Sequence, residues 1–182
     1  MTVNYKKTLF ITALVIFQIA FCAENYAQKA RGEKAVKAAA KIFYKKYLPL
    51  FGYPSVASLR RLRPFLSGSL YSSIKYERER MKLWSAKNPG EKPPVIEDLF
   101  VCDHYEPPAR FRTGIAEITP PRDAAVTVYF DYFEKGKMLA TCQTKLVFIR
   151  SNGRWLLDNI VFEKGADLRT LLAREDYETL PG

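Results

Sequence analysis

Few side chains in this sequence have the types and spacing that catalysis or metal binding requires. His104 is the only histidine among the 182 residues, so a catalytic triad or a cysteine–histidine pair would have to use it. Its neighbour Asp103 would point to the opposite side in an extended segment. A zinc site takes three or four ligands at recognisable spacings, which one histidine and two distant cysteines do not supply. The sequence therefore predicts no catalytic residues and no metal site.

Two aspartates in extended segments are the other candidates for moving a proton. Asp131 and Asp158 would have to point into an apolar pocket that tunes their pKa values. Asp158 interrupts an alternation of apolar residues, which a β-bulge explains more simply. A small-ligand-binding protein or enzyme, with a pocket between a long helix and a sheet, is therefore the alternative function. The expected pocket lining is Tyr44, Tyr47, Trp84, Tyr129, Asp131 and Phe148.

The three cysteines divide into one near the N-terminus, Cys22, and two in the body of the chain. Cys102 and Cys142 would pair in an oxidising compartment, where disulfides form and persist. Two buried free thiols, packed as small apolar side chains, are the other arrangement. The residues alone leave both arrangements open.

The N-terminus has the order of a secretory signal peptide. Lys6 and Lys7 supply positive charge, an apolar run extends over residues 9–22, and the polar Glu24 and Asn25 follow. The run is shorter than the roughly 20 apolar residues that cross a bilayer comfortably. The sequence therefore predicts an exported protein.

We expect a signal peptide over residues 1–22, cleavage somewhere in 22–27, and a single α+β domain over 23–182. The domain is then periplasmic or secreted. A lipid anchor at Cys22 is the alternative, although Phe21 is bulky where a lipoprotein signal has a small residue.

The chain is strongly basic, with a formal net charge of +10 at pH 7. A basic excess permits binding to nucleic acid, anionic lipid or an acidic protein. The bases are spread over helical faces, no glycine-rich phosphate loop is present, and export disfavours nucleic acid as a target. We expect a protein partner, no nucleic acid and no cofactor, with membrane contact only through a lipid anchor.

The first half of the chain is predicted to be helical. Apolar residues recur at three- and four-residue steps from Glu33 to Phe51, which indicates an amphipathic helix. One or two further helices are expected from Ser58 to about Lys87, in the most basic part of the chain. Another face of the first helix is interpreted as a water-facing stripe of Lys34, Lys37, Lys41 and Lys45.

The second half is predicted to be extended. Asn152-Gly153 favours a tight turn, since both residues tolerate positive φ. A short helix over about 166–174 closes the chain. Helices followed by strands with short turns predict an α+β fold, with N-terminal helices packed on a curved antiparallel sheet of about four strands. Alternating residues place these strands at 111–119, 124–133, 138–149 and 154–162.

The end of the chain resembles that of a known superfamily. Residues 153–160 read Gly-Arg-Trp-Leu-Leu-Asp-Asn-Ile, and residues 165–169 read Gly-Ala-Asp-Leu-Arg. This ending is similar to that of many cone-shaped α+β domains of the cystatin-like kind, the superfamily named after nuclear transport factor two. The resemblance implies that a long helix lies across one face of a curved sheet, and that the outer face of the sheet can form a dimer.

More narrowly, the chain resembles a family of exported bacterial domains of unknown function within that superfamily. The shared motifs are Phe-Tyr-x-x-Tyr-Leu over residues 43–48 and an acidic–apolar–cysteine–acidic segment over residues 98–103. In that family a Gln-Asp pair often follows the cysteine, where this chain has Asp103-His104. Some relatives are immunity proteins that block secreted toxins, so the resemblance implies a non-catalytic domain that binds a protein partner as an immunity-type inhibitor.

Overall fold

The computed structural model describes residues 28–91, 99–102, 107–119 and 122–173. The predicted signal peptide with Cys22, and the pair Asp103-His104, lie outside these residues. The described chain has an α+β fold of helices and a four-stranded antiparallel sheet, as the sequence predicted.

The N-terminal helix is described over residues 28–47, and it buries the predicted apolar stripe. The prediction that it continues to Phe51 is wrong. Residues Leu48–Leu50 instead form the 3-10 helix η1. Pro49 lies in this turn, and proline has no backbone N–H to extend an α-helix. The helix also includes residues 28–32, before the predicted start at Glu33.

The second helical region consists of α2 (Val56–Leu62), η2 (Arg63–Phe65) and α3 (Gly68–Lys87). Pro64 lies in η2 and separates the two α-helices. The Ser67 hydroxyl accepts the backbone N–H of Leu70 at 3.0 Å, so Ser67 caps α3.

The sheet has the order β1-β2-β3-β4, with β1 at Arg110–Thr119, β2 at Asp123–Glu134, β3 at Lys137–Ser151 and β4 at Arg154–Phe162. Each strand pairs with the next in an antiparallel hairpin. Asn152 and Gly153 both have positive φ, at 50° and 77°, which confirms the predicted tight turn.

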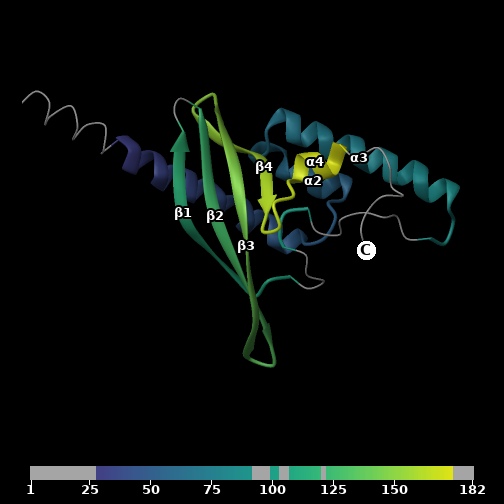
Figure 1. Ribbon diagram of the computed structural model, residues 1–182. Helices are drawn as coiled ribbons and strands as arrows, with labels where there is room; N and C mark the ends of the chain where they lie inside the picture. The colour runs from purple at the N-terminus through teal and green to yellow at the C-terminus, as the bar shows by residue number, and fades with distance from the viewer. Residues whose placement is uncertain (1–27, 92–98, 103–106, 120–121, 174–182) are drawn as a thin grey trace, which may run out of the picture.

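The N-terminal helix packs across one face of this sheet, here called the inner face. The ring of Tyr44 lies 5.4 Å from that of Phe111 on β1 and 5.0 Å from that of Phe130 on β2. Near the start of the helix, Gly32 lies beside Ile118 at the other end of β1. In Figure 1 the helix passes behind the strands, while α2, α3 and α4 (Leu168–Ala173) gather beside β4. The opposite face of the sheet, here called the outer face, points away from the helix.

A β-bulge in β4 joins the helices to the sheet. Val147 pairs with Asn159 and Phe148 with Leu157, so Asp158 is the extra residue, as predicted. The carbonyl of Leu157 accepts the N–H of Ser67, where α3 begins. These contacts fix the start of α3 against the last strand.

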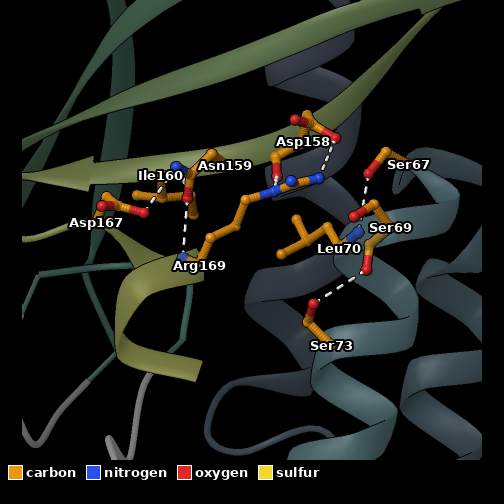
Figure 2. A network of polar contacts seen from close by, with 9 residues as sticks. All are labelled: Ser67, Ser69, Leu70, Ser73, Asp158, Asn159, Ile160, Asp167 and Arg169. Atoms are coloured by element: carbon orange, nitrogen blue, oxygen red, sulfur yellow. Dashed lines mark hydrogen bonds and ion pairs between the residues drawn. The ribbon is translucent and has the colours of Figure 1, made fainter. Parts of the chain in front are cut away.

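Helix α4 is attached at the same bulge (Figure 2). The guanidinium of Arg169 donates to the backbone and side-chain oxygens of Asp158, at 2.8 and 2.7 Å. The Asn159 amide oxygen accepts the N–H groups of Ile160 and Arg169, and its nitrogen donates to Asp167. Asp167 also accepts the N–H of Thr170, which caps a helix that begins at Leu168, after the predicted start at 166. Residue 174, the predicted end, lies outside the described residues.

We predict that Asn159→Ala lowers the free energy of unfolding by about 2 kcal/mol, because it leaves two partly buried N–H groups without an acceptor. Urea denaturation measures this loss. Gln143→Ala is the matched control, since this half-buried amide on β3 makes no side-chain hydrogen bond to a described residue. An equal loss in both variants would contradict the assignment.

A covalent bond fixes a short buried segment to the sheet. The sulfur atoms of Cys102 and Cys142 lie 2.10 Å apart, at disulfide distance, with their Cα atoms separated by 6.3 Å. Leu99, Phe100 and Val101 come immediately before Cys102 and are fully buried. The Phe100 ring packs against two rings of the N-terminal helix. The arrangement with two free thiols is not the one in this structure.

We predict that Cys102→Ser combined with Cys142→Ser lowers the stability by about 3–4 kcal/mol, because the bond closes a loop across a sequence separation of 40. Urea denaturation with and without reductant tests this. Reductant should destabilise the wild type by the same amount and leave the double variant unchanged. Two titratable thiols from this pair in the oxidised, denatured protein would refute the bond.

Candidate functional site

The polar centre of the outer face is Asp131. Strand neighbours point to opposite faces, and since Phe130 and Tyr132 belong to the core, Asp131 lies on the outer face. It sits directly between Arg110 on β1 and Thr141 on β3. Arg110 Nε donates to Oδ2 at 2.8 Å, and the Thr141 hydroxyl donates to Oδ1 at 2.8 Å. Both carboxylate oxygens are therefore held by neighbouring strands.

Two arginines cover this carboxylate. The side chain of Asp131 is only 2% exposed, whereas those of Arg110 and Arg112 are about 60% exposed. Arg112 Nε lies 4.0 Å from the same Oδ2 atom. Both arginines approach Asp131 through Nε, and their terminal nitrogens make no hydrogen bond to a described residue. The pair keeps an excess positive charge on the surface.

Aromatic rings hold both guanidinium groups in place. Arg110 lies 4.9 Å above the ring of Phe133, and Arg112 lies 4.3 Å above that of Tyr129. Gly114 makes room for the Tyr129 ring, since a Cβ atom there would lie 2.6 Å from Cε2. The two cations are thus ordered before any ligand arrives, which lowers the entropic cost of binding.

The carboxyl group of Asp131 is stabilised in its charged form. The hydrogen bond from Thr141 is the largest cause that lowers its pKa below 3.8, opposed by desolvation and reinforced by Arg110 and Arg112. A proton-transfer role near neutral pH needs a raised pKa. The ionised group instead anchors the two arginines.

A long hairpin extends beside this site. The strands β2 and β3 continue past β1 and β4 in Figure 1. Among the described residues, 132–140 pair only across this hairpin, because β1 starts at the level of Asp131 and β4 ends opposite Thr144. Near its tip, Met138 and Leu139 are 56% and 65% exposed. The Met138 sulfur lies 3.7 Å from the Thr141 hydroxyl, so this exposed apolar side chain borders the fixed cations of the outer face.

The residues of the predicted pocket divide between different places. Tyr44, Tyr47 and Phe148 are buried in the core between helix and sheet. Asp131 and Tyr129 lie on the outer face, on the other side of the sheet. The remaining residue, Trp84, is half-buried near the end of α3 and is not part of the core cluster. The structure does not bring these six side chains together.

Tyr44 is polar as well as buried. Its hydroxyl donates to the backbone oxygen of Phe100 at 2.6 Å. Burial raises its pKa far above the usual value, and the neighbouring hydroxyl of Thr144 offsets this only in part. Tyr44 is therefore a neutral donor that fixes the disulfide-bonded segment to the N-terminal helix.

Sequence reasoning singled out Asp131 but missed the residues around it. Arg110, Arg112 and Thr141 were not among the predicted site residues. A usable signal was present, because Arg110 and Arg112 are two positions apart and so share one face of a strand. Asp158, the other predicted aspartate, is used by Arg169 in the bulge.

The described residues contain no group of three or more His, Cys, Asp or Glu side chains that could hold a metal ion. Within the same residues, no helix has the length and apolar character needed to cross a membrane.

Comparisons with models of protein families, with curated proteins and with solved structures find no match to this chain.

We predict that Thr141→Val and Arg110→Gln each raise the pKa of Asp131, because the hydrogen bond from Thr141 is the largest cause that lowers it and Arg110 lowers it through both a hydrogen bond and its charge. Carboxyl ¹³C NMR during an acid titration measures both. A lowered pKa in the folded state stabilises the protein above the unfolded value of 3.8, and this contribution is lost as pH falls through the folded value.

The control for this titration is Thr127→Val on β2, which removes a half-buried hydroxyl of the sheet that makes no hydrogen bond to Asp131. The assignment fails if Thr127→Val and Thr141→Val move the Asp131 titration equally.

Proposed function

We propose that this protein is an exported, non-catalytic domain that binds a protein partner through the outer face of its sheet. The observation that carries the proposal is the pair Arg110 and Arg112, ordered on aromatic rings above a buried, ionised Asp131. Arginine and aromatic side chains are enriched where protein interfaces are strongest. No further element of the described chain covers the outward ends of these arginines.

The chemistry of the site favours an acidic side chain of the partner. Each guanidinium offers terminal N–H groups in a planar fork, which matches the two oxygens of a carboxylate. Asp131 neutralises one of the two charges, and Glu117 on the same face pairs with Lys145 at 2.7 Å. A nucleic-acid backbone would meet both of these carboxylates, whereas one inserted carboxylate meets only the arginines.

The exposed hairpin supplies the apolar part of such an interface. Met138 and Leu139 lie near its tip, beyond the end of β1. A partner that places an acidic residue over the arginines can cover these side chains with its own apolar surface. This arrangement gives orientation through charge and affinity through burial.

The proposal also includes the fold family and the location of the protein. We infer a cone-shaped domain of the nuclear transport factor two-like kind, supported by a helix across one face of a four-stranded antiparallel sheet. The apolar run over residues 9–22 supports export, and the disulfide of Cys102 and Cys142 suits an oxidising compartment. Within this class, an immunity-type inhibitor of a secreted toxin is the sharpest form of the proposal.

We predict that a photo-crosslinking residue at Leu139 links the protein to one partner in extracts of the cells that make it. The same group at Val56 on α2, which is 56% exposed, should link to none. Arg110→Gln combined with Arg112→Gln should abolish the product, because the carboxylate of the partner loses both guanidinium groups. Gel electrophoresis and mass spectrometry identify the product.

The matched control is Arg60→Gln combined with Arg61→Gln, which removes two exposed charges from α2 without touching the sheet. This control should retain the product. Equal crosslinking from Leu139 and Val56, or equal loss in both double variants, would contradict binding through the outer face. An enzyme assay of the captured partner, with and without this protein, then tests inhibition.

A further inference from the structure

The N-terminal helix carries a second charged surface, on the side away from the sheet. Residues 28–47 contain seven lysines or arginines and a single acidic residue, Glu33. The helix spacing aligns four of the lysines along one face over about 16 Å, at roughly 1.5 Å per residue. Apart from the half-buried Lys37, these four are exposed. We call this surface the lysine face, defined by Lys34, Lys37, Lys41 and Lys45.

The charges of the lysine face are not used inside the protein. None of its four ammonium groups forms an ion pair with a described residue. Four unpaired like charges on one helix repel one another, which costs helix stability. An external anion can therefore relieve this repulsion. On a helix with alternating basic and acidic side chains there would be no such repulsion to relieve.

An apolar position borders the lysine face. Ile42 follows Lys41 and is 49% exposed, although the helix buries its other large apolar side chains in the core. A row of basic side chains with an exposed apolar residue beside it is typical of helices that lie on a membrane surface. Nucleic acid offers no comparable environment to an aliphatic side chain.

The chain before the helix adds an independent argument. The helix is described from residue 28 on, and only five residues separate it from the apolar run over residues 9–22. With a lipid on Cys22, the helix starts close to the membrane surface, whereas after cleavage without a lipid the lysine face itself has to hold the domain there. A basic segment next to an apolar or lipid anchor is a recurrent way to hold a protein on anionic lipid.

We propose that the lysine face docks the domain on an anionic lipid bilayer. The helix then lies between the membrane and the sheet, since its apolar stripe packs on the inner face. The outer face, with Arg110 and Arg112, is directed away from the lipid. This inference goes beyond the proposed function and does not depend on it.

Lysine acetylation in the full-length chain tests the docking. The protein is mixed with vesicles of phosphatidylcholine alone or of phosphatidylcholine with phosphatidylglycerol, and labelling is read residue by residue by mass spectrometry. The anionic vesicles should slow labelling of Lys34, Lys41 and Lys45 several-fold, and leave Lys75 and Lys82 on α3 unchanged. High salt should remove the protection, because screening weakens surface electrostatics.

A charge-matched pair of variants separates this surface from net charge. Replacing all four lysines of the lysine face by glutamine should weaken co-sedimentation with the anionic vesicles about tenfold or more. Replacing four exposed bases elsewhere should leave it within about twofold. These control positions are Arg60, Arg61, Lys75 and Lys82.

The proposal is overturned by equal labelling in neutral and anionic vesicles, or by equal weakening in the two variants. Protection of the lysine face by a short DNA duplex but not by vesicles would likewise overturn it. Labelling of the wild type decides the question even where a fourfold variant fails to fold. Partner crosslinking from Leu139 is read separately, so the two proposals fail independently.

Discussion

The whole arrangement depends on the burial of one face of the sheet by aromatic side chains of the N-terminal helix. Phe43 and Tyr47 form ring contacts with Phe100, and the ring of Tyr44 contacts that of Phe130 on β2. Burial of such large side chains is the main favourable contribution to folding in a domain of this size. Because the helices cover only the inner face, the polar and charged groups of the outer face must find their partners among the side chains of that face.

The structure satisfies the outer face with charge instead of further apolar layers. Asp131 lies on the outer face and is nevertheless buried, because two arginines and a threonine from adjacent strands cover it. Among the described residues, Arg112 shares Asp131 with Arg110 and pairs with no other carboxylate. Hydrogen bonds to the charged form of a carboxylate lower its pKa. Such a carboxylate is suited to holding cations and not to transferring protons near neutral pH.

Local patterns predicted the elements well, and failed where distant residues meet. Alternation located the four strands, and the polar break at Asp158 located the bulge, because both depend on neighbours in sequence. The helix end was missed when periodicity was followed past Pro49. The partners of Asp131 could be predicted only from the register of three strands. That register brings Arg110, 21 positions earlier, and Thr141, 10 positions later, next to Asp131. The disulfide could not be predicted either, because the separation of Cys102 and Cys142 along the chain does not give the distance between them in the fold.

The irregularity in β1 has a consequence for solubility. This strand forms an edge of the described sheet, and its pairing with β2 shifts between Thr113 and Ala116, where Gly114 and Ile115 interrupt the ladder. A regular exposed edge would offer its free backbone groups to another copy of the chain. A bulge increases the local twist of its strand, and together with the two arginines at the start of β1 it disfavours pairing of this edge with the strand of a neighbouring molecule.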